Sequence, residues 1–351
     1  MEIYIMDRDL DVIGVVSTYD SIRWINKFYE PGTFEAVFAF TDHMNSRLQC
    51  GNLLYKEDEP EPGIITGKHI KLDKRGKQTI QVWGRMASSF LSRRIIWEKT
   101  ILEGTPEEAM RQLVLQQVIT PMNINRKMPL ISLGALKGYN GTISKQVTYD
   151  NLQETLTAIA MASGLGYRLR LDIDEKKFLF EVLRGEDRTA GSSHPCIFSR
   201  DFQSVYTQDY VEDGSNYRNI CLIGGAGEDE GRTMAIVGEA EGMERYEMFC
   251  NAAYLDADDT DAGYIARLEQ KGVEKLNSYA LAKSFENKIN WSKAMPHDLG
   301  DLVTCTDEQW GITMDAQITA IEKGYSRTEE SYVVTLGIQA PTLIDLIKAK
   351  E

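Results

Sequence analysis

The sequence predicts a mainly β protein with α+β insertions. We expect two related antiparallel β-barrel domains, an α+β domain between them and a helical insertion within the second barrel. Three observations support this prediction. A strand–acidic turn–strand segment occurs twice, apolar and polar residues alternate through much of the first hundred positions, and a segment with strong helix-capping signals follows them.

The repeated segment occupies residues 51–84 and 300–337. Its two copies share a glycine, a leucine, an acidic pair and a glycine–isoleucine pair in one order, with a one-residue gap. The matched residues are Gly51, Leu53, Asp58, Glu59, Gly63 and Ile64 in the first copy, and Gly300, Leu302, Asp307, Glu308, Gly311 and Ile312 in the second. On this alignment Ile70 corresponds to Ile318, and the closing strands end at Gly84 and Gly337. A unit used twice per subunit favours an architectural role in a ring over an enzyme.

Composition limits the function classes. The 351 residues are enough for two or three domains, and 42% hydrophobic and 26% charged residues are ordinary for a folded soluble protein. The net charge of −14 argues against sequence-specific nucleic-acid binding, because phosphates require a positive surface.

The cysteines and the amino terminus indicate the compartment of synthesis. The five cysteines form no Cys-x-x-Cys pair, which indicates free thiols in a reducing compartment; they are Cys50, Cys196, Cys221, Cys250 and Cys305. Residues 1–7 carry an acid where a signal peptide needs basic residues, and no apolar run approaches the ~20 residues that span a bilayer. We expect synthesis in the cytoplasm and no membrane insertion by this chain.

Residues 1–99 are predicted to form the first barrel. Strands at 2–6 and 12–16 flank an acidic turn, and Ile22 and Trp24 begin the next alternating run. A further strand has a two-residue apolar period, at Phe34, Ala36, Phe38 and Phe40.

A long hairpin closes this first barrel. Its strands at 64–72 and 78–83 are joined through a turn that contains Gly76. Helical spacing after Gly84 predicts a short helix that plugs one end of the barrel, with Arg93 and Arg94 in salt bridges at the rim.

Residues 100–195 are predicted to form the α+β domain. Thr105-Pro-Glu-Glu108 combines a hydroxyl cap, a proline at the first helical position and a glutamate three residues after the cap, and Pro121 ends this helix. A hairpin near 130–149 leads to a second helix, capped by Asp150 and ended by Gly164 and Gly166. Strands at 167–173 and 177–183 follow, and residues 186–195 are the best linker candidate.

The second barrel is predicted to comprise residues 196–250 and 285–340. Its strands are expected at 205–212, 218–224, 232–238 and 244–250, before the repeated unit at 300–338. Residues 251–284 form the helical insertion, whose helix runs to about Ala282 and places Ile265, Leu268, Leu276 and Tyr279 on one face. An amphipathic tail at 341–351 ends the sequence.

Motifs that could support chemistry have simpler structural interpretations. The four histidines lack metal-ligand spacing; they are His43, His69, His194 and His297. The acidic run 256–261 lacks the glycine and distal glutamate of an EF-hand loop, so we expect Asp258, Asp259 or Thr260 to cap the following helix. Gly224-Gly-Ala-Gly227 lacks the P-loop ending and is expected to be a hairpin turn. We therefore predict no catalytic, cofactor-binding or metal-binding residues, and no cofactor.

Four stretches resemble one known family. The run Gln81-Val-Trp-Gly-Arg-Met-Ala-Ser-Ser-Phe-Leu-Ser-Arg-Arg-Ile-Ile96 resembles the strand-into-helix signature of siphophage tail-hub proteins of the siphovirus Gp37-like kind. Three later stretches are similar to the same family in the same order: 219–225, 244–249 with the helix after it, and 299–304.

The resemblance implies a baseplate or tail-tip hub with tube-type barrels, akin to the hub of contractile tails. Such a hub is a homotrimer whose paired barrels form a pseudo-sixfold ring at the end of the hexameric tail tube. The implied partners are the tail tube or distal tail protein, the tape-measure protein, and tip or fibre proteins. The implied location is the virion tail of a phage or prophage particle. The alternative is a tail-associated peptidoglycan hydrolase or carbohydrate-binding tail protein, with carboxylates in a cleft of the 100–195 domain.

Overall fold

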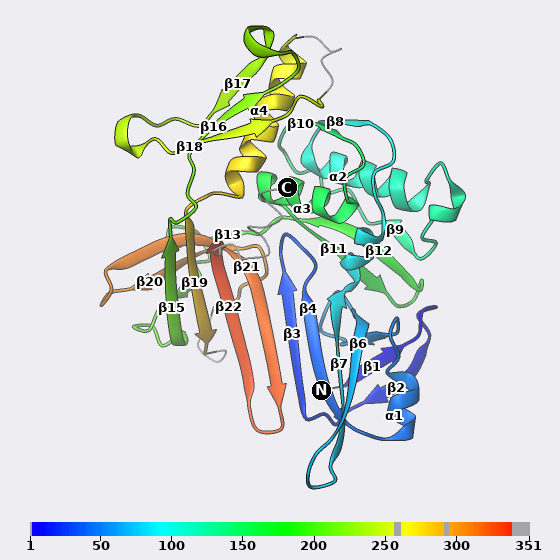
Figure 1. Ribbon diagram of the computed structural model, residues 1–351. Helices are drawn as coiled ribbons and strands as arrows, with labels where there is room; N and C mark the ends of the chain where they lie inside the picture. The colour runs from blue at the N-terminus through cyan, green and yellow to red at the C-terminus, as the bar shows by residue number, and fades with distance from the viewer. Residues whose placement is uncertain (1, 256–260, 291–294, 339–351) are drawn as a thin grey trace.

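The computed structural model describes residues 2–255, 261–290 and 295–338. One fourteen-stranded sheet includes strands from both halves of the chain. In Figure 1 its long strands fill the lower part of the molecule, with an α+β unit above it on one side and a small sheet with a long helix above it on the other. The protein is mainly β, as predicted, but within the described residues the strands form an open path and not two closed barrels.

Eight long strands form the main run of this sheet, and we call it the eight-strand run. Its order is β6 (Gly63–Leu72), β7 (Gln78–Met86), β4 (Thr33–Ala39), β3 (Ser21–Lys27), β21 (Ile312–Ser326), β22 (Glu330–Ile338), β19 (Ala282–Ile289) and β15 (Val205–Asp213). Every neighbouring pair is antiparallel.

Shorter strands extend this run beyond β6 and attach to it along β21. On the first half, β5 (Leu53–Tyr55) pairs with β6, and β1 (Ile3–Met6) pairs with β5 and with β2 (Val12–Val16). On the second half, β20 (Leu302–Asp307) pairs with β21 and, in parallel, with β13 (Asp187–Arg188) and β14 (Ile197–Phe198). The predicted linker 186–195 therefore contains a paired strand, because two short segments dock on the edge of β20.

Each half of the sheet has its own apolar core. In the first half Trp24, Phe34 and Phe38 are buried under β3 and β4, as the alternation predicts. The helix α1 (Asp42–Arg47), which the sequence analysis did not predict, lies in the same half with Thr41 as its cap. The predicted short helix after Gly84 is the 3-10 helix η1 (Ala87–Arg93). In the second half Phe285, Ile318 and Leu336 are buried together.

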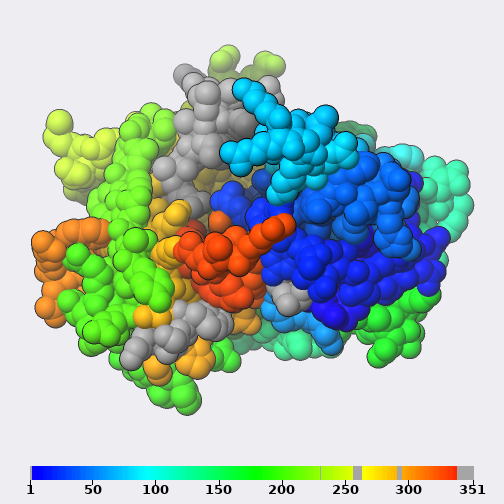
Figure 2. Space-filling model, turned by 90° about the horizontal axis from the view of Figure 1, so that it is seen from below, coloured from blue at the N-terminus to red at the C-terminus, as the bar shows by residue number. Residues whose placement is uncertain are grey.

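Figure 2 shows from below how the two halves meet. The β21–β22 hairpin lies between residues of the first half and the β15 region. Pairing of β21 with β3 joins the halves, from Ala320 opposite Lys27 to Ser326 opposite Ser21.

The α+β unit confirms several local predictions. Helix α2 (Pro106–Val114) begins with the complete capping box of Thr105 and Glu108, and its last turns are π-helical (η2, Leu115–Ile119) before Pro121. Helix α3 (Leu152–Ser163) ends at Gly164 in the left-handed conformation. Its cap is Asn151 and not Asp150, because the Asn151 side chain accepts hydrogen bonds from the backbone N–H groups of Gln153 and Glu154.

The strands of this unit differ from the prediction in one respect. β11 (Gly166–Asp172) and β12 (Lys177–Leu183) form the expected hairpin. The expected hairpin near 130–149 is absent from the described structure. Instead β9 (Ile131–Leu133) pairs in parallel with β12, and β10 (Ile143–Val147) pairs with β8 (Thr100–Gly104). The 3-10 turn η3 (Ile124–Arg126) precedes β9.

A third unit stands apart from the long sheet. Strands β16 (Ile220–Gly224), β17 (Met234–Val237) and β18 (Glu247–Asn251) form a separate sheet, with the 3-10 turns η4 (Asp229–Gly231) and η5 (Gly242–Glu244) between them. Helix α4 (Asp261–Asn277) packs on this sheet through Leu268, so these strands share a core with the helix and not with β15. The helix ends at Asn277, earlier than predicted, because Ala282 already begins β19. The predicted cap at 258–260 and the predicted tail at 341–351 lie outside the described residues.

Candidate functional site

The two copies of the repeated segment form the same hydrogen-bonded arrangement. The N–H of Gly51 donates to the carbonyl oxygen of Ile65 (2.8 Å), and the N–H of Gly300 donates to that of Ile318 (2.9 Å). Both glycines have a positive φ, +94° and +96°. The strand register then shifts directly after Ile65 and directly after Ile318, so each copy has a bulge at the same place.

This register corrects part of the sequence alignment. Ile318 corresponds to Ile65, whereas the sequence analysis matched it with Ile70. The connecting turns differ in length: β20 pairs with β21 over six residue pairs, but β5 pairs with β6 over only two. Pro60 and Pro62 lie between β5 and β6, and neither has an N–H to extend the ladder.

The acidic pairs at these turns therefore have different roles. Asp58 and Glu59 both lie against the buried ammonium group of Lys56. Asp307 ends β20, and its carboxylate forms an ion pair with the guanidinium group of Arg200 (2.6 Å).

The correspondence extends beyond the repeated segment by two strands in each half. Within the segment, β7 corresponds to β22. Beyond it, β4 corresponds to β19 and β3 corresponds to β15. Phe34 pairs with Gly84 as Phe285 pairs with Leu336, and Trp24 pairs with Phe34 as Tyr210 pairs with Phe285. The ring centroids of both aromatic pairs are close, at 5.5 Å and 4.8 Å.

The sequence contains a signal for these strands that the sequence analysis missed. Thr33-Phe34-Glu35 in β4 occupies the same pairing positions as Ser284-Phe285-Glu286 in β19. A match of three residues is too short to stand out from chance similarity. In addition, β15 and β19 are separated along the chain by the whole β16–β18 and α4 unit, whereas β3 and β4 are joined by a short turn.

The eight-strand run has two free edges. On the β15 side, residues 205–213 pair with β19 alone among the described strands. On the β6 side, β5 covers only Gly63 and Ile64, which leaves residues 67–72 with β7 as their one partner in the described structure. Exposed apolar side chains line both edges, including Ile70 and Leu72 on β6 and Tyr206 and Val211 on β15. Long exposed edges of this kind are templates for pairing with another chain.

One face of the eight-strand run is polar and carries both signs of charge. Its cations include Arg23, Lys71, Arg85 and Lys288, and its anions include Glu35, Asp209, Glu286 and Glu322. Arg23 and Glu322 form a two-pronged ion pair across the β3–β21 junction, with two N–O distances of 2.6 Å.

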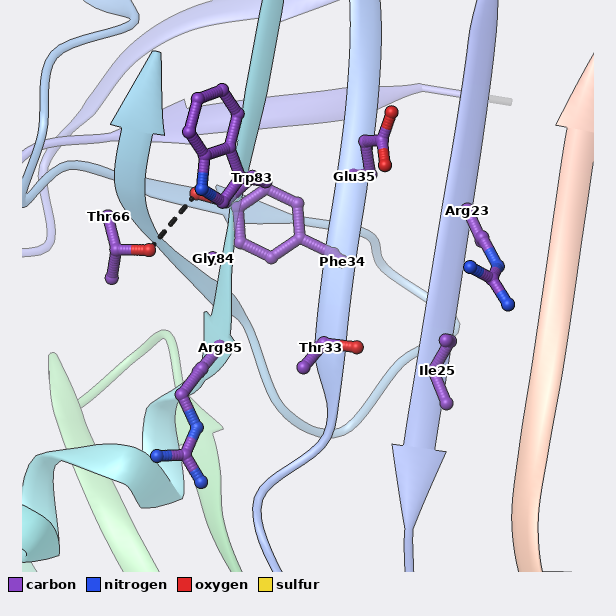
Figure 3. A pocket seen from close by; sticks show the side chains of 9 residues that line it. All are labelled: Arg23, Ile25, Thr33, Phe34, Glu35, Thr66, Trp83, Gly84 and Arg85. Carbon is purple, nitrogen blue, oxygen red and sulfur yellow. Dashed lines mark hydrogen bonds between the residues drawn. The ribbon is translucent and has the colours of Figure 1, made fainter. Parts of the chain in front are cut away.

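A hollow of about 320 Å³ opens on this face. Figure 3 shows Trp83 and Arg85 from β7, Phe34 and Glu35 from β4, and Arg23 from β3 around it. The Thr66 hydroxyl donates to the Trp83 carbonyl oxygen at the bulge. Its lining contains no nucleophile with an adjacent base.

A second cavity of about 660 Å³ lies where the α+β unit meets the sheet, and charged groups from both line it. Several of its carboxylates already have partners. Glu59 binds Lys323 (2.6 Å) and accepts from the Asn26 amide (2.6 Å), and Asp301 binds Arg188 (2.9 Å). The Glu59–Lys323 pair joins the two halves of the sheet, and the Arg188–Asp301 pair joins β13 to the start of β20.

The most perturbed carboxyl group of this region is Glu61. It is buried, and it accepts hydrogen bonds from the backbone N–H groups of Ser88 and Leu169. Burial raises its pKa to about 7, although both hydrogen bonds favour the charged form. No sequence motif marks this residue, since it lies between two prolines in an acidic loop.

The residues considered for chemistry do not converge. No group of three or more His, Cys, Asp or Glu side chains within the described residues is close enough to hold a metal ion. Gly224 ends β16, and Gly227 lies in the connection between β16 and β17, as predicted for a hairpin. Arg93 and Arg94 differ from the predicted rim salt bridges: Arg93 lies over the Phe90 ring (4.3 Å), and Arg94 donates to the carbonyl oxygens of Arg93 and Arg126.

Comparisons with known proteins give a family for the chain and solved structures with the same fold. The profile of the family described as "Siphovirus ReqiPepy6 Gp37-like protein" matches residues 2–338. The chain belongs to this family. No curated protein sequence matches it.

Three solved structures show the same fold at low sequence identity. A tail protein from Neisseria meningitidis MC58 has a TM-score of 0.60 at 13% identity, with 95% of each chain covered. The 43 kDa tail protein of prophage MuSo2 from Shewanella oneidensis has a TM-score of 0.60 at 13% identity, covering 96% of this chain and 98% of that one. The prophage tail protein gp18 from Listeria monocytogenes EGD-e has a TM-score of 0.61 at 14% identity, covering 100% and 98%. This siphovirus Gp37-like chain therefore has the fold of phage and prophage tail proteins.

None of the helices in the described ranges combines the length and the apolar character needed to cross a bilayer.

Proposed function

We propose that this siphovirus Gp37-like chain is the structural hub of a phage or prophage tail, at the tail tip or baseplate. In this proposal three copies form a ring that joins the hexameric tail tube to the tip. The family supports the phage context, and the fold of tail proteins supports the place in the particle.

The observation that carries the proposal is the head-to-tail repeat within one sheet. The strand order β6-β7-β4-β3 is followed directly by its counterpart β21-β22-β19-β15. One chain thus supplies two similar four-strand units in tandem, with a free edge at each end. Chains that join head to tail form a closed ring when the rotation from one chain to the next divides a full turn evenly. Three such chains would present six similar units.

The polar face of the eight-strand run suits the bore of such a ring. Aromatic and aliphatic side chains on the opposite face are buried in the two cores, so the polar face is left to line a water-filled passage. Its mixed charges would neither bind nor strongly repel a passing chain. This supports passage of the tape-measure protein and then of DNA without nucleic-acid binding.

The proposed partners are those that a ring at the end of a tail would meet. The tail tube or a distal tail protein would contact one rim of the ring, and tip or fibre proteins the other. The protein would be made in the host cytoplasm and act in the virion tail.

The alternative of a peptidoglycan hydrolase or carbohydrate-binding tail protein has less support. The carboxylates near the α+β unit are engaged in ion pairs and backbone hydrogen bonds, as for Glu59, Glu61 and Asp301. We propose that the chain is not an enzyme.

Native mass spectrometry of the purified chain at several concentrations tests the ring. We expect trimers whose fraction rises with concentration, and no loss of turbidity when the protein is added to host cell walls. A strict monomer at high concentration would contradict the ring, and rapid clearing of walls would favour the hydrolase.

A further inference from the structure

We infer the contact between copies in the ring: β15 of one copy pairs antiparallel with β6 of the next, in the register of the internal β3–β21 junction. The inference rests on the proposed ring. It places Lys71 of one copy directly opposite Asp209 of its neighbour, and Lys68 opposite Glu212.

The register follows from the correspondence of the halves. The shared bulge equates Ile318 with Ile65, so Gly324 of β21 corresponds to Lys71 of β6. The aromatic pairs equate Trp24 with Tyr210, so Arg23 of β3 corresponds to Asp209 of β15.

Inside one chain Gly324 lies opposite Arg23. The equivalent junction between chains therefore pairs Lys71 with Asp209. By the same steps, the pairing of Ile321 with Asn26 becomes a pairing of Lys68 with Glu212.

Charge supports this register independently of the repeat. Residues 68–71 of β6 contain two lysines and no acid, whereas residues 209–213 of β15 contain three acids and no base. Opposite charges directly across an antiparallel pair stabilise it, and like charges destabilise it. The register that the internal repeat implies places both lysines opposite acids.

The Lys71–Asp209 pair tests the register better than the Lys68–Glu212 pair does, because its side chains have no competing ion pair within the described residues of one copy. Both side chains are exposed, and within the described residues neither has an ion-pair partner. Lys68 already donates to the Asn45 carbonyl oxygen (2.8 Å), and Glu212 already binds Lys283 (3.3 Å) and accepts from the Tyr210 hydroxyl (2.8 Å). A contact between Lys68 and Glu212 would have to compete with these.

The internal junction shows what the acid at 209 would contact. Arg23 reaches across to Glu322, two residues along β21 from its direct partner Gly324. Because Glu322 corresponds to His69, Asp209 would lie between Lys71 and His69. In the internal junction the cation lies on β3 and the acid on β21. Between copies the acid would lie on β15, the counterpart of β3, and the cation on β6, the counterpart of β21.

Disulfide trapping tests the register. In a Cys50→Ser background, which removes the exposed native thiol, Lys71→Cys is combined with Asp209→Cys. Directly opposite residues lie within the Cα separation that a disulfide spans. Mild oxidation should give covalent dimers and trimers. The matched control, Lys71→Cys with Asp213→Cys, places the thiols roughly 13 Å apart along the strands and should not cross-link.

Charge reversal provides a second measurement that needs no oxidation. Lys71→Glu alone and Asp209→Lys alone should each raise the trimer dissociation constant at least about fivefold, since each places like charges opposite one another. The double variant should restore it. Lys74→Glu, in the turn beyond the paired residues, should leave it unchanged.

The outcomes separate the register from the ring. A wild-type chain that stays monomeric overturns the ring and this inference with it. A wild-type trimer in which 71/209 does not cross-link, or in which 71/213 cross-links instead, overturns the register alone. A double variant no better than the single variants also counts against the register.

Discussion

At the scale of single residues, Glu61 makes the clearest departure from ordinary behaviour. Its carboxyl group is buried where the first half of the sheet meets the α+β unit, and it accepts from Ser88 on one side and from Leu169 on the other. Burial raises its pKa from 4.5 to about 7, so the folded state favours the protonated form. Its contribution to stability is complete below pH 4.5 and is lost as the pH rises to about 7.

We therefore predict that Glu61→Gln removes a pH dependence of stability. In the wild type the free energy of unfolding should fall by about 3 kcal/mol between pH 4.5 and 7.5 because of this group. Glu61→Gln should flatten that part of the profile, measured by urea unfolding at a series of pH values. Glu57→Gln, in the exposed part of the same loop, is the matched control. Equal slopes for the wild type and Glu61→Gln would contradict the assignment.

Residue-scale features could be predicted where the signal is local. Thr105 with Glu108, and Gly164, function as their neighbours in sequence indicate. Asn151 was missed because Asp150 is an equally good cap by residue type, and backbone geometry decides between them. Glu61 could not be predicted, since its burial depends on Leu169 from another unit.

At the scale of elements, the glycine that starts each repeated unit has a special backbone. Gly300 has a φ of +96°, and a Cβ built there would lie 2.2 Å from the ring of the buried residue Phe28. Gly311, in the turn of the same unit, has a φ of +64° and open space around it. The two positions separate backbone strain from steric clash.

Gly300→Ala should destabilise the protein by about 3 kcal/mol or more, because strain and overpacking add. Gly311→Ala should cost about 1 kcal/mol, from the left-handed backbone alone. Thermal or denaturant unfolding of both variants checks the difference. Similar losses for the two would show that Phe28 can move aside.

Element types were largely predictable, and element partners were less so. Alternation identified β3 and β4, and capping signals identified α2. The region near 130–149 reads as two strands close in sequence, yet β9 and β10 each pair with a strand distant in sequence. Periodicity shows that a segment is extended, but only tertiary packing selects its partner.

At the scale of the whole molecule, the pairing of β3 with β21 makes one sheet of two units that the sequence analysis treated as separate barrels. The open path leaves β6 and β15 as its free edges. Their outward-facing amides face solvent in one copy and would be bonded in the ring.

Hydrogen–deuterium exchange at low and high protein concentration should reveal this change. Peptides that cover residues 67–72 and 206–213 should gain protection at high concentration, while peptides from β22 and β4 should not change. Only the backbone amides of β6 and β15 that point away from the sheet at its edges should gain protection. The other amides of these two strands already bond to β7 and β19. Protection confined to other surfaces would place the contact between copies elsewhere.

The sequence predicted part of the overall architecture. The repeat at Gly51 and Gly300 was found, but the register beyond it was misjudged because the turns differ in length around Pro60 and Pro62. The sequence analysis assigned β16–β18 to the second barrel, whereas in the structure they form a separate sheet with its own core. An inserted unit can have the same strand periodicity as the sheet that it interrupts. The boundaries of the domains stay a prediction.

The opposite charges of the two edges also decide which assemblies are disfavoured. Two copies that met through their β6 edges would align lysines, and two that met through β15 would align acids. Symmetric pairs that would halt growth are thereby discouraged, and each added subunit must point the same way as the last. The subunits of such an assembly would therefore all have the same orientation before any other protein binds.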